Sequence, residues 1–176
     1  MVTGTAVPVE EYLRTSYEPD MEYVDGQLVE RSVGEHRHSH LQGILIRVLG
    51  LRGEERGFEV YPEHRIVLHA GRRYRVPDAC VKAVPYEPTP VLERPDLVIE
   101  ILSSDDTLTE AAEKCAEYFR FGISGIWVAD PYRKALYSYG EDGLRLVNPT
   151  IPENELTGAV DFAEIFAELD RSGRRP

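Results

Sequence analysis

A dense run of hydrophobic residues occupies residues 95–102, P-D-L-V-I-E-I-L. A strand with one solvent-exposed face alternates apolar and polar residues, and this stretch does not. The pattern therefore predicts a central strand that is covered on both sides. Glu100 lies in the middle of it. A carboxylate there is costly unless it is paired, protonated or bound to a metal ion, so we expect the chain to supply a partner for it.

Hydrophobic residues at helical spacing predict four helices. The first three cover residues 9–14, 36–51 and 107–121, and the last one runs from the cap at Asp161 through Leu169. Gly50 and Gly53 are expected to end the second helix, and Gly122 the third. The run S-S-D-D-T before the third helix supplies candidate N-caps, and Asp161 caps the last helix.

Further strands are predicted on both sides of the central one. Residues 21–31 form a hairpin about Asp25-Gly26, which is the sequence signal of a type I′ turn. Residues 58–70 turn at Gly71-Arg72 into residues 74–84, which gives an antiparallel pair. Residues 126–129 form the strand after the third helix. Residues 136–139 and 144–147 pair as a second hairpin across Gly140–Gly143.

The length of 176 residues suits one domain. We expect residues 1–20 to form an N-terminal segment that precedes its core and residues 170–176 to form a disordered tail. The N-terminus lacks the pattern of a signal peptide and no apolar run is long enough to span a membrane, so we expect a cytoplasmic protein. Cys80 and Cys115 both have apolar neighbours, which favours two buried free thiols over a disulfide.

The net charge is −11 and the isoelectric point is about 4.9. This charge opposes nonspecific binding to a polyanion, because phosphate contacts need clustered Lys and Arg. It does not exclude a nuclease whose site is neutralised by metal ions. Arg72, Arg73 and Arg75 are the densest basic cluster. They either contact phosphates or solvate a sheet edge, and the sequence favours the edge.

Two residues are candidate partners of Glu100. Asp78 is carried by the strand R-V-P-D-A-C-V, and Lys114 lies beside the apolar stripe of the third helix. Two acids on neighbouring strands can share a hard cation such as Mg²⁺ through oxygen ligands. Lys114 can then hold a water or a developing anion. The alternative is a buried ion pair between Glu100 and Lys114, with Asp78 ending a strand.

A cluster of His36, His38 and His40 precedes the stripe of the second helix. Residues i and i+4 are neighbours on a helix, so only His36 and His40 would face together, and the sequence shows no third ligand for a metal. We therefore interpret this cluster as an exposed, polar helix entrance.

Several segments in this order resemble a known family. They are E-Y-V-D-G-Q-L-V-E at 22–30, R-V-P-D at 75–78, L-V-I-E-I-L-S-S at 97–104, K-C-A-E-Y at 114–118 and F-G-I-S-G-I-W-V-A-D-P at 121–131. This set resembles the Uma-type putative restriction endonuclease family of the PD-(D/E)xK superfamily. The resemblance implies an α/β (α+β) protein with the restriction-endonuclease-like fold, in which helices flank a mixed central β-sheet.

The resemblance also implies a site. Asp78 and Glu100 would bind Mg²⁺ or Mn²⁺, with the main-chain carbonyl of Ile101 as a further ligand. The superfamily pattern places a lysine two residues after the acid, where this chain has Leu102. The resemblance implies that in this family the corresponding lysine lies on the following helix, where it is Lys114. Many members add a glutamate from the first core helix or nearby, for which Glu30 and Glu35 are candidates.

The predicted function is hydrolysis of phosphodiester bonds in DNA by a Mg²⁺-dependent endonuclease. Asp78, Glu100 and Lys114 would be its catalytic residues. The low positive charge suggests a homodimer, which combines two sites and two arginine clusters. The alternative is a catalytically silent scaffold or interaction module that keeps the fold and an ion pair.

Overall fold

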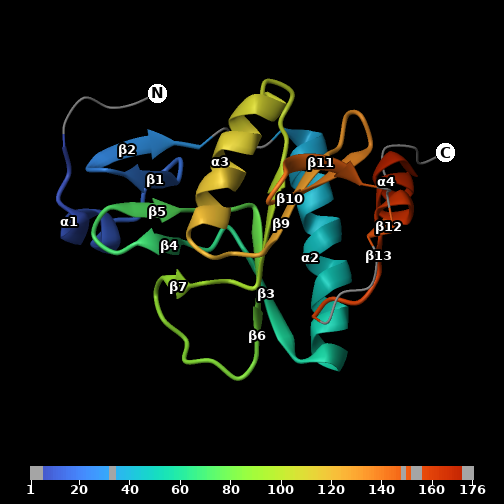
Figure 1. Ribbon diagram of the computed structural model, residues 1–176, viewed down its shortest axis with the longest axis horizontal. Coiled ribbons are helices and arrows are strands. Elements are labelled where there is room, and N and C mark those ends of the chain that lie inside the picture. The colour runs from blue at the N-terminus through green and yellow to red at the C-terminus, as the bar shows by residue number, and fades with distance from the viewer. Residues whose placement is uncertain (1–5, 32–34, 148–149, 152–155, 172–176) are drawn as a thin grey trace.

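The computed structural model describes residues 6–31, 35–147, 150–151 and 156–171. In this part of the chain, helices flank two mixed β-sheets, which confirms the predicted α+β class (Figure 1). The four helices are α1 (Val9–Arg14), α2 (His36–Arg56), α3 (Leu108–Arg120) and α4 (Phe162–Arg171). None of the described helices is long and apolar enough to cross a membrane.

The predicted central strand lies inside a six-stranded sheet of order β11-β10-β9-β8-β6-β3. It is β8, and all five of its residues are buried. It pairs in parallel with β9 and antiparallel with β6. The strands of this sheet are β3 (Phe58–Pro62), β6 (Ala79–Ala83), β8 (Leu97–Ile101), β9 (Gly125–Asp130), β10 (Ala135–Gly140) and β11 (Gly143–Val147).

The two faces of β8 pack against different helices. Ile99 and Ile101 belong to a hydrophobic cluster with residues of α2 and α4. Val98 and Leu102 belong to a second cluster, with Ala111, Cys115 and Tyr118 of α3. Because side chains alternate along a strand, the position between Val98 and Leu102 also faces α3. That position is Glu100, so the fold directs its carboxylate toward the α3 face.

A second sheet has five strands in the order β2-β1-β5-β4-β7. Its strands are β1 (Met21–Val24), β2 (Gln27–Glu30), β4 (Ile66–His69), β5 (Arg73–Arg75) and β7 (Leu92–Glu93), and a two-stranded ladder joins β12 (Thr150–Ile151) to β13 (Val160–Asp161). The predicted turn between β1 and β2 is confirmed. Asp25 and Gly26 have φ of 49° and 90°, and a type I′ turn requires positive φ at both positions.

Residues 58–70 and 74–84 pair antiparallel, as predicted, but neither region is one uninterrupted strand. Each divides in two, and the halves pair antiparallel in different sheets, β3 with β6 and β4 with β5. Two residues between the halves interrupt the ladder. Pro77 has no backbone N–H, and Glu63 has φ of 48°. Asp78 therefore lies where the two sheets diverge, directly before β6.

Helix α2 runs past Gly50 and Gly53 to Arg56, so the predicted end was wrong. The helix ends instead at Gly57, which has φ of 78° and donates its N–H to the Gly53 carbonyl. Gly53 has a packing role. A Cβ at this position would lie 2.3 Å from the carbonyl oxygen of Phe58, so only glycine permits the observed contact between α2 and β3.

The expected C-terminal tail is also partly wrong. Asp170 and Arg171 belong to α4, and Asp170 pairs with Arg37 at 2.9 Å. Residues 172–176 of that tail and residues 1–5 of the lead-in lie outside the described residues. Thr107 caps α3 in a capping box with Glu110, and Asp161 accepts the N–H of Glu164, as predicted.

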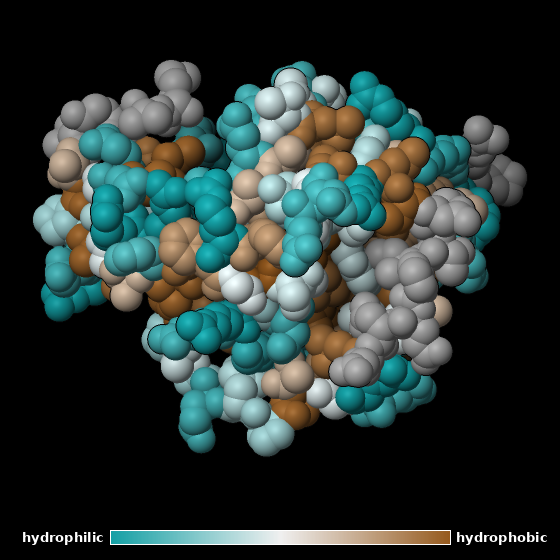
Figure 2. All heavy atoms as spheres, viewed as in Figure 1, coloured by the Kyte–Doolittle hydropathy of each residue, from teal (hydrophilic) through white to brown (hydrophobic). Residues whose placement is uncertain are grey.

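Polar residues cover much of the face seen in Figure 2, with hydrophobic residues between them. One hydrophobic area lies over the β10–β11 hairpin, where Leu146 of β11 is 68% exposed. Cys80 and Cys115 are both buried and free, as predicted. They belong to the same cluster between β6, β8 and α3.

Candidate active site

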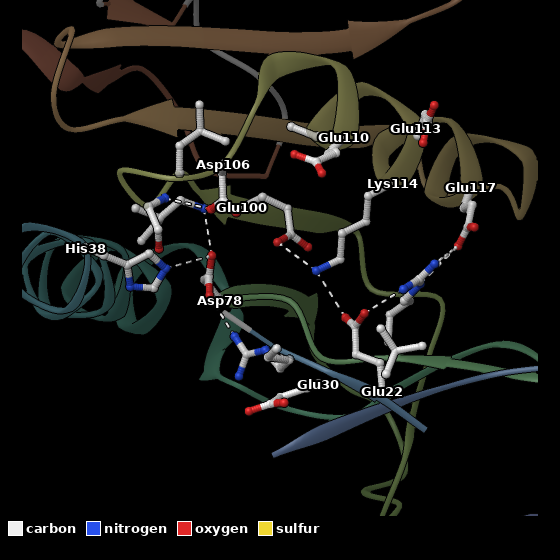
Figure 3. Close-up of a pocket in the computed structure, with 17 residues that line it drawn as sticks. Glu22, Glu30, His38, Asp78, Glu100, Asp106, Glu110, Glu113, Lys114 and Glu117 are labelled. Carbon is white, nitrogen blue, oxygen red and sulfur yellow. Dashed lines mark hydrogen bonds and ion pairs between the residues drawn. The ribbon is translucent and has the colours of Figure 1, made fainter. Parts of the chain in front are cut away.

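A cavity of about 680 Å³ opens between α3 and the place where the two sheets meet. Its wall combines residues of β1, β2, β8, α3 and the segment before β6 (Figure 3). All three residues predicted to carry the chemistry line it, namely Asp78, Glu100 and Lys114, and so does Ile101. The fold therefore brings together residues that are far apart in the sequence.

Lys114 contacts carboxylates from both sheets. Its Nζ lies 3.0 Å from Oε2 of Glu100 and 3.1 Å from Oε1 of Glu22. Tyr118, one turn further along α3, donates its hydroxyl to the other oxygen of Glu100. Glu100 is thus held by two residues of α3, at positions i and i+4 on one helix face.

Asp78 is held by three donors. Arg31 Nη2 lies 2.7 Å from Oδ1, the backbone N–H of Ile101 lies 2.7 Å from Oδ2, and His38 Nε2 lies 3.3 Å from Oδ2. The bond to Ile101 ties Asp78 to the residue after Glu100. The two acids are therefore fixed relative to each other by the backbone of β8.

Burial and charge act in opposite directions on these groups. Burial alone would lower the pKa of Lys114, but the carboxylates of Glu100 and Glu22 raise it above its usual value, so the ammonium is charged at neutral pH. Burial raises the pKa of Glu100, and Lys114 opposes that effect. For Asp78, burial is outweighed by His38 and Arg31, which lower the pKa of its carboxyl group.

Glu22 was missed as a site residue. It is 4% exposed, accepts the N–H of Val76 at 3.1 Å and lies 2.6 Å from Arg75 Nη1. Burial would raise its pKa, but Lys114 and Arg75 lower it. The signal that identified Glu100, a carboxylate within a short apolar strand, was also present here, because Glu22 stands between Met21 and Tyr23 in β1.

His38 corrects the interpretation of the histidine cluster as an exposed helix entrance. Its side chain is buried and contacts Asp78. Burial alone would lower the pKa of His38, but the hydrogen bond and charge of Asp78 raise it above its usual value. His36 and His40 do face each other as predicted, with ring centroids 5.9 Å apart.

The basic cluster is not at a sheet edge. Arg73 and Arg75 belong to β5, which lies between β1 and β4. Arg75 is engaged by Glu22 and by Glu117 of α3, at 2.6 Å and 2.7 Å. Arg73 pairs with Asp25 and Glu117, and Arg72 pairs with Asp25. Arg73 and Arg75 therefore connect α3 to the five-stranded sheet through Glu117, whereas the exposed Arg72 pairs with Asp25 at the surface.

The two glutamates considered as a third acid have different surroundings. Glu30 is exposed and lines the cavity. Glu35 accepts hydrogen bonds from Ser104 and Tyr132 at 2.5 Å, and both bonds lower its pKa. Glu22 is the acid that lies nearest to Lys114 after Glu100.

The donor set suits a hard cation. No group of three or more Asp, Glu, His or Cys side chains among the described residues is arranged to hold a metal ion by itself. Mg²⁺, however, keeps several waters and is usually held by one or two carboxylates together with substrate phosphates. Asp78 and Glu100 supply two such carboxylates. Cationic nitrogens of Arg31 and Lys114 lie against one oxygen of each and already compensate part of this negative charge.

Comparison with known proteins agrees with this architecture. A crystal structure of a putative nuclease belonging to DUF820, from Anabaena variabilis ATCC 29413, has a TM-score of 0.79 at 22% identity and covers 93% of this chain and 99% of its own. This likeness shows that the chain has the same fold as that protein. Comparison with curated proteins gives no match. Residues 9–169 match Uma2, described as putative restriction endonuclease, and the chain therefore belongs to that family.

Proposed function

We propose that the protein is a Mg²⁺- or Mn²⁺-dependent endonuclease that hydrolyses phosphodiester bonds in DNA. The observation that carries the proposal is the position of the Lys114–Glu100 ion pair. A structural ion pair needs no access to solvent, yet this one lines a cavity of about 680 Å³ together with Asp78. Membership of a putative restriction endonuclease family supports the same reaction.

The cation would be held by the carboxylates of Asp78 and Glu100 and by the main-chain carbonyl of Ile101. When bound, it supplies Lewis acidity to the scissile phosphate and lowers the pKa of a water. The protein keeps the two acids at a fixed separation, because the Ile101 N–H binds Asp78 while Tyr118 binds Glu100. This rigidity favours a single geometry for the reacting groups.

Lys114 would orient the attacking water and stabilise the negative charge that grows on the phosphate oxygens. A water oxygen forms the new bond to phosphorus and gives up a proton to solvent, while the bond from phosphorus to the leaving oxygen breaks and that oxygen takes up a proton from solvent. Lys114 is suited to the electrostatic part of this role, since Glu100 and Glu22 keep it charged. Glu22 fixes the ammonium from the opposite side to Glu100.

A second candidate is a scaffold without catalytic activity. The observation that favours it is that each oxygen of Asp78 and Glu100 already has a donor from the described residues, namely Arg31, Ile101, His38, Lys114 and Tyr118. In a scaffold these contacts are permanent. In the nuclease, a cation takes over part of the charge compensation.

Thermal melting of wild type and Lys114→Met, with and without Mg²⁺, distinguishes the two. Breaking a buried ion pair costs about 3–5 kcal/mol, and the scaffold predicts this loss in both conditions. The nuclease predicts a smaller loss in Mg²⁺, because the cation shares the neutralisation of Glu100. Lys134→Met is the matched control, since that side chain is 52% exposed and lies outside the cavity. Equal losses with and without Mg²⁺ would contradict the nuclease.

A further inference from the structure

Arg31 differs from the two other cationic side chains that line the cavity. Lys114 lies between two carboxylates, and Arg75 is bonded through Nε, Nη1 and Nη2 to Glu22 and Glu117. Both are held on more than one side by buried or half-buried acids. Arg31 has one buried carboxylate partner, Asp78, and a looser contact with Glu63 at 3.5 Å. Glu63 is 53% exposed, so that contact is worth little.

The two oxygens of Asp78 differ in how easily their present donors can move. Its Oδ2 accepts the N–H of Ile101, which is fixed within β8. Its Oδ1 is contacted by Arg31 at 2.7 Å. A guanidinium on a flexible side chain can swing away, whereas a strand N–H cannot. A divalent cation held by Asp78 would bring a second positive charge next to Arg31, and repulsion between the two would favour release of the movable guanidinium.

The displaced guanidinium would remain in a strongly acidic cavity. Among the described residues, eight carboxylates line the cavity against three Lys and Arg side chains. The acids are Glu22, Glu30, Asp78, Glu100, Asp106, Glu110, Glu113 and Glu117. A phosphate that enters this cavity needs a cationic donor that is not already shared between two acids. Arg31 satisfies this condition once it leaves Asp78, and the planar guanidinium matches two phosphate oxygens at once.

We propose that Arg31 is a phosphate-binding residue of this site. It holds Asp78 while no cation is present, and exchanges that carboxylate for non-bridging oxygens of the substrate phosphate when a divalent cation binds. This inference rests on the proposed nuclease function. It adds a residue that neither the sequence nor the family resemblance identified, and it couples cation binding to phosphate binding through a single side chain.

If Arg31 exchanges Asp78 for phosphate, one variant should change the affinity for Mn²⁺ and the affinity for DNA in opposite directions. Arg31→Gln removes the cation that competes for Asp78, so Mn²⁺ should bind about tenfold more tightly or better in calorimetry. The same variant loses its phosphate contact, so in saturating Mn²⁺ its affinity for a phosphorothioate-linked DNA oligonucleotide should fall about tenfold or more, measured by fluorescence anisotropy. A purely structural Arg31 would change neither affinity in this way.

Two further variants complete the test. Arg31→Lys keeps the charge and the fold but loses the paired donors, so its Mn²⁺ affinity should stay near wild type while its oligonucleotide affinity falls. Arg14→Gln makes the same change of charge at an exposed position outside the cavity and should alter neither affinity. If Arg31→Gln does not fold, Arg31→Lys alone decides.

The outcomes separate this inference from the proposed function. If wild type binds and cuts DNA while both Arg31 variants bind the oligonucleotide as wild type does, the role of Arg31 is overturned and the nuclease stands. If wild type binds no oligonucleotide in Mn²⁺ and cuts no DNA, both are overturned. Tighter Mn²⁺ binding together with weaker oligonucleotide binding in Arg31→Gln would establish the exchange.

Discussion

Lys114 joins carboxylates that belong to different sheets. Glu100 comes from β8 of the six-stranded sheet and Glu22 from β1 of the five-stranded sheet, and the Nζ lies 3.0 Å and 3.1 Å from them. Arg75 holds Glu22 from the other side. At the scale of single residues, the site is therefore a chain of alternating charges in which each ion is compensated by its neighbours. We expect the loss of one charge to affect the neighbours that it compensates.

Asp78→Asn should weaken binding of Mg²⁺ or Mn²⁺, because it removes one of two anionic ligands while preserving the shape of the side chain. The measurement is isothermal calorimetry of wild type and variant. Asp142→Asn is the matched control, since Asp142 is 69% exposed in the β10–β11 turn. Equal affinities of wild type and Asp78→Asn would remove Asp78 from the cation site.

Glu22→Gln should destabilise the protein by about 1–3 kcal/mol at neutral pH, the scale for a buried hydrogen-bonded charge. Lys114 and Arg75 lower the folded-state pKa of Glu22. Its contribution is therefore present above the unfolded pKa of about 4.3 and is lost as the pH falls through the folded pKa. The difference in unfolding free energy between wild type and variant should shrink from pH 7 to pH 3.

Urea unfolding at several pH values measures this difference. Glu113→Gln serves as the control, because Glu113 lines the same cavity but is exposed. A difference for Glu22→Gln that is unchanged at pH 3 would contradict the account of its ion pairs.

A site residue could be predicted where the pattern of its sequence neighbours indicated its environment. Glu100 stood out because a carboxylate interrupts an apolar strand, and the spacing of the third helix placed Lys114 beside its apolar stripe. The contacts of Arg31 and His38 depend on how the two sheets meet, and no local pattern contains that information, whereas Glu22 carried the same local signal as Glu100 and was overlooked. Polar residues in a hairpin or at a helix start are usually exposed, so the sequence favoured the wrong environment for His38.

At the scale of elements, two glycines of α2 with the same expected role have different surroundings. A Cβ at Gly53 would lie 2.3 Å from the Phe58 carbonyl oxygen, while nothing lies within 4 Å of one at Gly50. Gly53→Ala should therefore cost about 1–3 kcal/mol through overpacking. Gly50→Ala should gain about 0.5–1 kcal/mol, because alanine has a lower entropy cost in a helix interior.

Thermal melting tests this pair directly, since each kcal/mol shifts the midpoint by about 2–4 °C for a chain of this size. The two variants make the same chemical change three residues apart, so each is the control of the other. Shifts of the same sign would contradict the described packing of α2 on β3.

Most elements were predictable because each has its own periodic pattern and end signals. The central strand, the capped α3 and both hairpins are confirmed. The errors occurred where a tertiary contact overrides local propensity. The contact of Gly53 with Phe58 lets α2 continue through a glycine. The break at Pro77 sends the halves of one predicted strand into two sheets, which no alternation of apolar residues revealed.

At the scale of the whole molecule, charge is the main constraint on the proposed function. The net charge of −11 repels DNA at long range, and the cavity itself is lined by an excess of acids. We propose that the protein acts as a homodimer, which would bring two sites to one substrate. Light scattering at micromolar concentration should give about twice the chain mass of 19.9 kDa. A monomer at that concentration would contradict the proposal.

The most direct test of the central claim is cleavage of supercoiled plasmid and of single-stranded DNA by wild type and Lys114→Met. We predict that wild type cuts DNA in Mg²⁺ or Mn²⁺ and stops when the cation is chelated. Lys114→Met should be slower by about 10²-fold or more, the scale for removing one transition-state donor. If wild type cuts neither substrate in either cation, and neither cation shifts its melting curve, the account of Asp78, Glu100 and Lys114 as a nuclease site is wrong.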